Sequence, residues 1–138
     1  MLMSKVTLDF LTITKRIDQI PLPEFDHVVG IASGGTVAAC LLAYKAGCST
    51  TMIRINYRAE DNSPQRPSPV LLNSINIPEG VKHILLVDDV CVSGKTIATA
   101  KEALAGYKIT TFVLKGQADI VAFPEISECV VWPWKFDS

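Results

Sequence analysis

The chain has 138 residues, of which 49% are hydrophobic and 20% are charged, and its 13 Lys and Arg residues nearly balance its 14 Asp and Glu residues, giving a formal net charge of -1. A chain of this length can bury a core without disulfides or metals, and because no linker divides it we expect a single domain over residues 1–138. The charge balance and the lack of any basic tract argue against a nucleic-acid partner.

The apolar runs are far shorter than the roughly 18 residues of a membrane-spanning helix, and the first five residues do not resemble a secretion leader. We therefore expect a cytoplasmic protein with no membrane partner. The four cysteines lie 8, 43 and 38 residues apart, so none forms a Cys-x-x-Cys pair, and only two histidines could complete a metal site. A zinc site is not expected. The sequence predicts four reduced thiols, packed largely as small hydrophobes.

The first predicted elements are an amphipathic helix and a strand–loop–helix unit. Apolar residues at three- and four-residue steps predict the helix over about residues 7–19. An apolar run over residues 26–32 then predicts a buried strand, the Ser-Gly-Gly run at residues 33–35 a tight loop, and residues 36–46 a buried helix. Residues 50–56 return as a strand.

The second half of the chain repeats this pattern after a long loop. The loop covers residues 57–81, is rich in proline, and includes short strand pairs around residues 70–77. The predicted elements that follow are a strand over residues 82–87, a turn over 88–94, a helix over 95–105, a strand over 109–114, and short strands near 119–122 and 129–131.

Strands that alternate with helices predict an α/β fold with a doubly wound parallel sheet of about five strands and helices on both faces. Ligands of such sheets bind beyond the carboxyl ends of the strands. Both glycine-bearing turns are expected at that edge.

Three familiar motifs do not fit. Residues 94–96 resemble the end of a Walker A loop, but Asp89 stands where that loop needs a glycine. Ala32 stands where a dinucleotide fingerprint needs its second glycine, and Ile31 stands where a nucleophile elbow around Ser33 needs its first. A P-loop NTPase, a dinucleotide-binding enzyme and a serine hydrolase are therefore not expected.

The run over residues 84–96 does point to a chemistry. It combines four apolar residues, the acids Asp88 and Asp89, an apolar triplet and Ser-Gly-Lys-Thr. Backbone N–H groups at the start of the following helix can hold a phosphate dianion with the help of the helix dipole, and the hydroxyls of Ser93 and Thr96 add donors. Paired carboxylates can accept hydrogen bonds from a ribose diol and face a magnesium ion. In the alternative interpretation, the acids only cap the helix and the glycine only turns the chain.

The same run resembles the signature of the type I phosphoribosyltransferases, which bind 5-phosphoribosyl 1-pyrophosphate. Cys91 is its one mild departure, since a branched aliphatic residue is usual there. The resemblance implies the type I phosphoribosyltransferase fold, with a small hood built from the N- and C-terminal segments, and Mg²⁺ as cofactor. It implies Asp88 and Asp89 as catalytic residues, with Asp89 also as the metal ligand. The substrate-binding residues that it implies are Ser33, Gly34, Gly35, Val92, Ser93, Gly94, Lys95, Thr96 and Lys115.

The resemblance extends over most of the chain. Residues 32–35 stand where the family has its pyrophosphate loop, although Ser33 replaces the Lys or Arg common in 6-oxopurine enzymes, which implies a weaker contact. The alternative is an ordinary tight turn. Residues 57–69 resemble the mobile loop that closes over the substrate. The arginines that could meet pyrophosphate on closure, or instead have a solvated surface role, are Arg54, Arg58 and Arg66.

The acceptor base is suggested by likeness to the small xanthine-guanine and hypoxanthine phosphoribosyltransferases. Lys115 resembles the lysine that reads the 6-oxo group, and such a donor excludes adenine, whose amino group is no acceptor. Alternatively, Lys115 simply ends an exposed strand. Val92 stands where these enzymes carry an acid near N7, and Cys129 stands where they stack an aromatic ring. Trp132 or Trp134 would be nearer the base after an alignment slip, or they serve packing or a subunit contact.

The resemblance therefore implies transfer of ribose 5-phosphate from 5-phosphoribosyl 1-pyrophosphate to a nucleobase, with a 6-oxopurine of purine salvage favoured. Without an acid at position 92, proton transfer would lose help typically worth about 10²- to 10⁴-fold. The alternatives are a regulatory protein that binds the donor or a nucleotide without catalysis, and a transferase for another base. We expect a homo-oligomer, a dimer or a tetramer.

Overall fold

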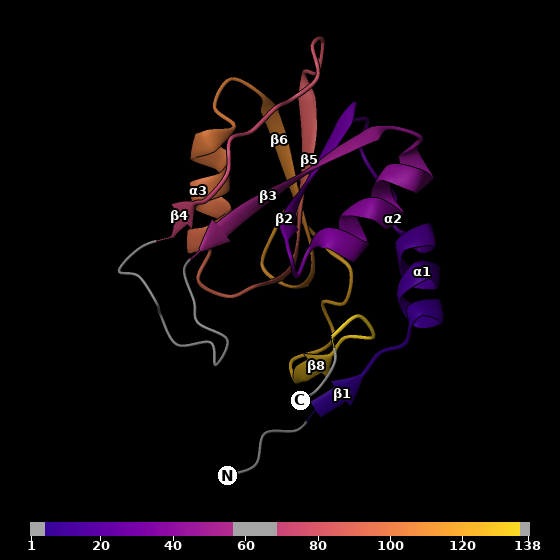
Figure 1. Ribbon diagram of the computed structural model, residues 1–138. Helices are drawn as coiled ribbons and strands as arrows, with labels where there is room; N and C mark the ends of the chain where they lie inside the picture. Colours follow the sequence, from indigo (N-terminus) through magenta and orange to yellow (C-terminus); the bar gives the residue numbers. More distant parts are fainter. Residues whose placement is uncertain (1–4, 57–68, 136–138) are drawn as a thin grey trace.

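The computed structural model describes residues 5–56 and 69–135. Within these residues, six strands form the central sheet, in the order β4-β3-β2-β5-β6-β7 (Figure 1). The strands are β2 (His27–Ala32), β3 (Ser49–Asn56), β4 (Val70–Leu71), β5 (His83–Cys91), β6 (Lys108–Gly116) and β7 (Ile120–Val121). Neighbouring strands are parallel except for the antiparallel β3–β4 pair. The predicted α/β fold is confirmed, and the strand beyond the expected five is the two-residue β4 at the sheet edge.

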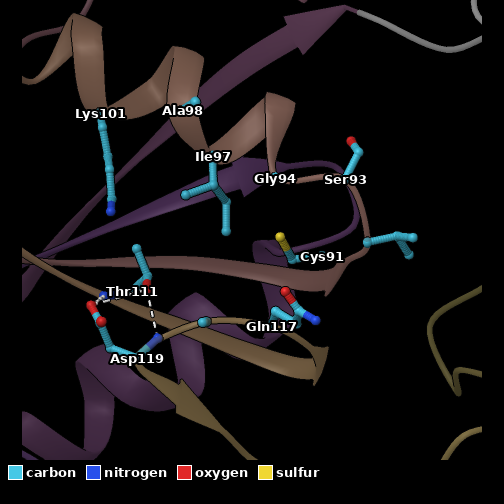
Figure 2. A pocket seen from close by; sticks show the side chains of 11 residues that line it. Cys91, Ser93, Gly94, Ile97, Ala98, Lys101, Thr111, Gln117 and Asp119 are labelled. Atoms are coloured by element: carbon cyan, nitrogen blue, oxygen red, sulfur yellow. Dashed lines mark hydrogen bonds between the residues drawn. The ribbon is translucent and has the colours of Figure 1, made fainter.

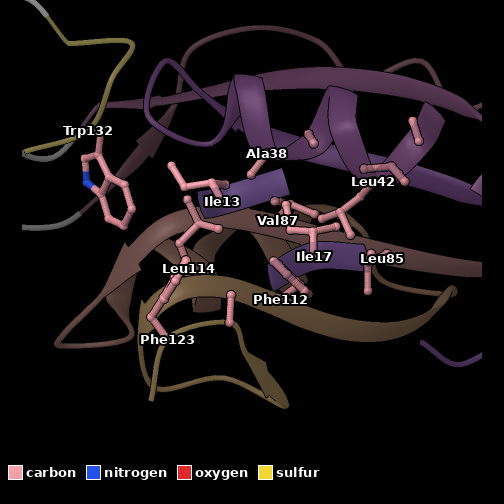
Figure 3. Packing of buried hydrophobic residues seen from close by; sticks show 14 of the residues in the cluster. Ile13, Ile17, Ala38, Leu42, Leu85, Val87, Phe112, Leu114, Phe123 and Trp132 are labelled. Atoms are coloured by element: carbon pink, nitrogen blue, oxygen red, sulfur yellow. The ribbon is translucent and has the colours of Figure 1, made fainter. Parts of the chain in front are cut away.

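Helices cover both faces of this sheet. They are α1 (Phe10–Gln19) and α2 (Thr36–Ala46) on one face and α3 (Lys95–Ala103) on the other (Figure 1). Successive side chains of a strand point to opposite faces, so Leu85 and Val87 of β5 pack with α1 and α2, whereas Ile84 and Leu86 pack with α3. Figure 3 shows the first of these two clusters, in which side chains of α1 meet those of β5 and β6.

Two predicted boundaries are wrong for local reasons. The first helix begins at Phe10 instead of Thr7, because Asp9 is extended and its carboxylate accepts a hydrogen bond from the Thr12 N–H at 2.8 Å, which caps the helix. Strand β5 continues to Cys91 instead of ending at residue 87, because its hydrogen-bonded ladder with β6 continues past the acids. Asp88 and Asp89 therefore lie within a strand and not in a turn.

A separate two-stranded unit brings the two ends of the chain together. Strand β1 (Lys5–Thr7) pairs in parallel with β8 (Cys129–Val131), and the Leu8 N–H donates to the Val131 carbonyl at 3.3 Å. Figure 1 shows this pair apart from the main sheet, below the end at which β3 terminates. This unit, with the residues up to Lys135 that follow β8, is the predicted hood of N- and C-terminal segments.

The structure also bears on the predicted reduced, packed thiols and on the expected lack of a membrane-spanning helix. All four cysteines are unpaired, as predicted, but only Cys91 is buried and Cys48 half-buried, whereas Cys40 and Cys129 are exposed. The expectation of largely packed thiols is therefore wrong for the exposed pair. No helix in the described part of the chain is long and apolar enough to cross a membrane.

Two glycines with positive φ allow a test of the packing between β5 and β6. Gly116 ends β6 at a φ of +111°, where an added Cβ would overlap the Cys91 carbonyl, whereas Gly80 has a φ of +86° and open space around it. Gly80→Ala should lower the free energy of unfolding by about 1–2 kcal/mol, the cost of a left-handed backbone. Gly116→Ala should cost at least about 1–3 kcal/mol more, because the neighbouring backbone must shift. Urea unfolding followed by circular dichroism measures both, and equal losses would contradict the close approach.

Candidate active site

The acid pair lines a cavity of about 520 Å³ at the carboxyl end of the sheet. Both carboxylates are largely buried, and each accepts one backbone hydrogen bond at 2.8 Å: Asp88 from the Asp89 N–H, and Asp89 from the Val90 N–H. These two bonds hold the carboxylates in place and use one oxygen of each. The remaining acceptor positions are available for a ligand with hydroxyl groups or for a cation.

The Ser-Gly-Gly loop between β2 and α2 lies directly against this acid pair. A Cβ added to Gly34 would lie 2.6 Å from Oδ2 of Asp89, and one added to Gly35 would lie 2.7 Å from the Val87 carbonyl oxygen. Only residues without a side chain permit this approach. The two glycine-bearing segments that the sequence predicted at one edge are therefore in contact.

The amides of this loop are not all available to a ligand. The Gly35 N–H donates to the Ile31 carbonyl at 2.8 Å, and the Thr36 N–H to the Ser33 carbonyl at 3.2 Å. Within the residues that the structure describes, the N–H groups of Ser33 and Gly34 have no backbone acceptor. These two amides, beside Asp89, are the candidates for contact with an anion. The peptide bond between Ala32 and Ser33 is cis.

The segment between β5 and α3 provides a second set of amides. Gly94 precedes α3 with a φ of +81° and, lacking a side chain, cannot cap the first turn. Ser93 Oγ lies 3.4 Å from the Lys95 nitrogen, too long for a strong cap. The start of α3 therefore presents N–H groups and a positive dipole end that suit a phosphate. Ser93, Gly94 and Thr96 line the same cavity as the acids.

The other walls of the cavity come from β6 and the hood. Half-buried Lys115 of β6 lies opposite Val90 in the ladder and lines the cavity. The hood contributes Cys129, Val130 and Trp132 to the cavity wall. The Val92 side chain is 82% exposed. The structure thus places Lys115 and the acid pair in the walls of the same cavity.

The two tryptophans have different positions. Trp132 lines the cavity but is only 2% exposed, and it stacks on Trp134 with ring centroids 5.4 Å apart. Trp134 also packs against Phe10 of α1 and is not among the residues that line the cavity. Much of their role is therefore the packing of the hood, which was one of the two alternatives left open by the sequence.

Of the three arginines considered for pyrophosphate, one can be placed. Arg54 is exposed in β3 and is the register partner of Ala32, one residue before the Ser-Gly-Gly loop, but it does not line the cavity. Arg58, Arg66 and the predicted mobile loop up to residue 68 lie outside the described residues.

Lys135 is a site residue that sequence reasoning missed. Its Nζ lies 3.6 Å from Oδ2 of Asp89, and it lines the cavity. The signal in the sequence was weak, since a single lysine after a Trp-Pro-Trp run does not indicate that the segment turns back over the sheet.

A second cavity, of about 350 Å³, lies beside α3 and the segment over residues 91–94 that precedes it (Figure 2). Lys101 of α3 extends toward it, and Asp119 borders it. The Asp119 carboxylate already accepts from the N–H and the hydroxyl of Thr111, at 2.9 and 3.1 Å. Since the acid pair is absent from its walls, the larger cavity is the candidate site.

The sequence matches a known family over most of its length: residues 9–117 match the phosphoribosyl transferase domain. The chain belongs to this family. It is therefore a phosphoribosyltransferase, a kind of pentosyltransferase, and the resemblance seen in the residues 84–96 is confirmed. No curated protein matches this phosphoribosyltransferase in sequence.

Several solved structures share its fold. A purine phosphoribosyltransferase from Pyrococcus horikoshii is 22% identical with a TM-score of 0.74, and the match covers 99% of this chain and 97% of that one. A xanthine-guanine-hypoxanthine phosphoribosyltransferase from Helicobacter pylori is 16% identical with a TM-score of 0.67, and the match covers 96% of this chain and 93% of that one. A hypothetical protein from Neisseria gonorrhoeae with bound ppGpp is 18% identical with a TM-score of 0.69, and the match covers 99% of this chain and 92% of that one.

The acid pair of this phosphoribosyltransferase is electrostatically unfavourable without a ligand. Burial raises the pKa of Asp88 well above its ordinary value, and the neighbouring charge of Asp89 raises it further. Because the pKa of Asp88 is higher in the folded than in the unfolded chain, ionisation of Asp88 opposes folding. Below about pH 4, the pKa of an aspartate in the unfolded chain, Asp88 is protonated in both states and does not destabilise the fold. As the pH rises through the pKa of Asp88 in the folded protein, this stability is lost.

Asp88→Asn should therefore stabilise the ligand-free protein at pH 8, by on the order of 1 kcal/mol for each unit of pKa shift, and much less at pH 4. The asparagine oxygen can still accept from the Asp89 N–H, so the backbone contact is kept. Urea unfolding at both pH values in magnesium-free buffer measures the difference. Asp18→Asn, at an exposed position of α1, is the control and should change little at either pH. A loss of stability for Asp88→Asn at pH 8 would contradict the assigned electrostatics.

Proposed function

We propose that this phosphoribosyltransferase transfers ribose 5-phosphate from 5-phosphoribosyl 1-pyrophosphate to a 6-oxopurine such as hypoxanthine, guanine or xanthine. One observation carries the proposal: a single cavity is lined by the buried acid pair, by the amide-rich start of α3 and by a lysine of the neighbouring strand. These three groups match the three parts of such a reaction, the ribose, its phosphate and a base with an exocyclic carbonyl.

The donor end of the cavity suits a sugar phosphate. In the proposal, the N–H groups from Val92 to Thr96, including that of Lys95, and the hydroxyls of Ser93 and Thr96 bind the 5-phosphate. Asp88 and Asp89 accept hydrogen bonds from the ribose hydroxyls. The amides of Ser33 and Gly34 meet the pyrophosphate, and Gly35, whose N–H is bonded internally, serves the close packing of this loop.

Asp89 is also the proposed magnesium ligand. In the described part of the chain no three side chains of His, Cys, Asp or Glu gather into a metal site. Magnesium in such enzymes needs fewer protein ligands, because it is held by one or two carboxylates together with substrate phosphates. A carboxylate at the cavity wall that already attracts the ammonium of Lys135 fits this role. When bound, magnesium supplies positive charge that neutralises the departing pyrophosphate.

The base end of the cavity favours an acceptor with a carbonyl group. Lys115 can donate to the 6-oxo oxygen of a purine, and adenine has no acceptor at that position. Cys129, Val130 and exposed Val92 give the base an otherwise apolar surrounding.

Catalysis in this site is proposed to depend on positioning and charge. As pyrophosphate leaves, C1 of the ribose becomes positively charged, and the two carboxylates of Asp88 and Asp89 lie beside it. Val92 has no group that can take a proton from the base, so that proton must go to water.

We also propose that the enzyme acts in the cytoplasm as one domain per chain and assembles into a dimer or tetramer, which light scattering would measure.

Pyrophosphate release tests the reaction directly. The protein is incubated with 5-phosphoribosyl 1-pyrophosphate, magnesium and one base at a time, and we expect turnover with hypoxanthine, guanine or xanthine and not with adenine. Asp88→Asn/Asp89→Asn should abolish donor binding while the far-ultraviolet circular dichroism is unchanged. Preference for adenine or a pyrimidine would overturn the proposed base. Donor binding without turnover on any base would favour the regulatory alternative. The lack of a proton acceptor at Val92 is the observation that supports this alternative.

Lys115→Gln tests how the base is recognised. Loss of the ammonium should raise KM for the preferred 6-oxopurine by about 10- to 100-fold, the usual range for a hydrogen bond from a charged group, and should leave the affinity for the donor unchanged. Lys101→Gln is the matched control, because Lys101 lines the other cavity. An unchanged KM for Lys115→Gln would assign this lysine to the strand end alone.

A further inference from the structure

The leaving group places a demand on the site that its loop does not meet. Pyrophosphate departs with several negative charges, and stabilisation of such charge is usually the largest contribution to catalysis. The loop over residues 33–35 provides two amides and one hydroxyl but no cationic side chain. If the proposed function is correct, a cation from elsewhere in the chain should lie beside this loop.

Lys135 is in that position. Its Nζ is 3.6 Å from Oδ2 of Asp89, and this same oxygen lies 2.6 Å from the place of a Cβ on Gly34. The ammonium is thus separated from the loop by a single carboxylate oxygen. Arg54 is near the loop along the strand ladder but does not line the cavity, whereas Lys135 does.

The backbone of Lys135 is anchored. Its N–H donates to the Trp132 carbonyl at 3.1 Å, which closes a turn, and the Trp132 side chain belongs to the core cluster (Figure 3). The strand before this turn pairs with β1. A lysine at this position is therefore presented to the cavity by a fixed turn.

The ammonium itself is free to change partners. The Lys135 side chain is 59% exposed, and its contact with Asp89 is long for an ion pair. Although Asp89 is only 12% exposed, the solvated ammonium at this distance pairs with it more weakly than at hydrogen-bond distance, so the ammonium can move to a stronger anion. Magnesium at Asp89 would also repel it from that carboxylate.

We propose that Lys135 is a catalytic residue that binds the departing pyrophosphate, supplying the positive charge that the Ser-Gly-Gly loop lacks. In the step it serves, the bond between C1 and the pyrophosphate oxygen breaks and both electrons leave with that oxygen. The base nitrogen supplies the electron pair of the new C1–N bond, and its proton goes to water. Lys135 takes no part in the proton transfer, and its role is to stabilise the charge on the leaving group.

Calorimetric binding tests this assignment. Three probes are titrated in the presence of magnesium: 5-phosphoribosyl 1-pyrophosphate, inorganic pyrophosphate, and ribose 5-phosphate, which lacks the leaving group. Lys135→Gln should weaken the first two by about 10- to 100-fold and leave ribose 5-phosphate bound no more weakly than by the wild type. Lys135→Arg, which keeps the charge, should restore most of the loss. Lys108→Gln, at the opposite end of β6, is the control for a lost lysine.

Turnover gives a second readout. Lys135→Gln should lower kcat by about 10²-fold or more, the range for loss of a group that stabilises charge in the transition state, with KM for the base unchanged.

The outcomes separate the inference from the proposed function. If the wild type binds none of the three probes, both are wrong. If it binds them and Lys135→Gln binds pyrophosphate equally well, the assignment of Lys135 is wrong and the function stands. If Lys135→Gln weakens ribose 5-phosphate as much as pyrophosphate, Lys135 acts by holding Asp89 in place and does not bind the leaving group.

Discussion

The hydrogen-bonded ladder between β5 and β6 determines how the candidate active site is arranged. It pairs Asp88 with Val113 and Val90 with Lys115. The acid pair and the lysine therefore lie on neighbouring strands at one edge of the sheet, although Asp89 and Lys115 are 26 residues apart in the sequence. The ladder continues to Gly116, whose missing side chain lets it lie against Cys91. Every group assigned to the ribose, the phosphate or the base depends on this register.

The candidate site also contains two features that reduce the stability of the fold. Two carboxylates are buried side by side, and the helix that follows them has a glycine at its N-cap and only the long 3.4 Å bond from the Lys95 N–H to Ser93 Oγ in its first turn. Both features would be improved, as far as folding is concerned, by neutral or capping residues. A bound sugar phosphate would reverse both costs at once, because it supplies an anion to the helix and hydroxyl donors to the acids. Occupancy is therefore expected to stabilise the fold.

The parts of the fold that could be predicted are those with long, regular patterns. Continuous apolar runs identified β2 and β5, and a strand–acid–glycine–helix order identified both the family and the acid pair. Prediction failed where a few residues or distant contacts decide the structure. Strand β1 has three residues and exists through its pairing with β8, the acids remain in β5 because β6 supplies ladder partners, and Lys135 enters the site only through the fold of the hood.

The hood has one more property that follows from its packing. The two tryptophans of the chain are both in it, nearly parallel at 5° and in van der Waals contact range of one another. Excitation of either indole is shared with its neighbour at this separation, and no tryptophan elsewhere in the sequence adds to the emission. The tryptophan fluorescence of the protein therefore originates from the segment beside the cavity, and it reports the state of that segment and of the core against which Trp132 packs.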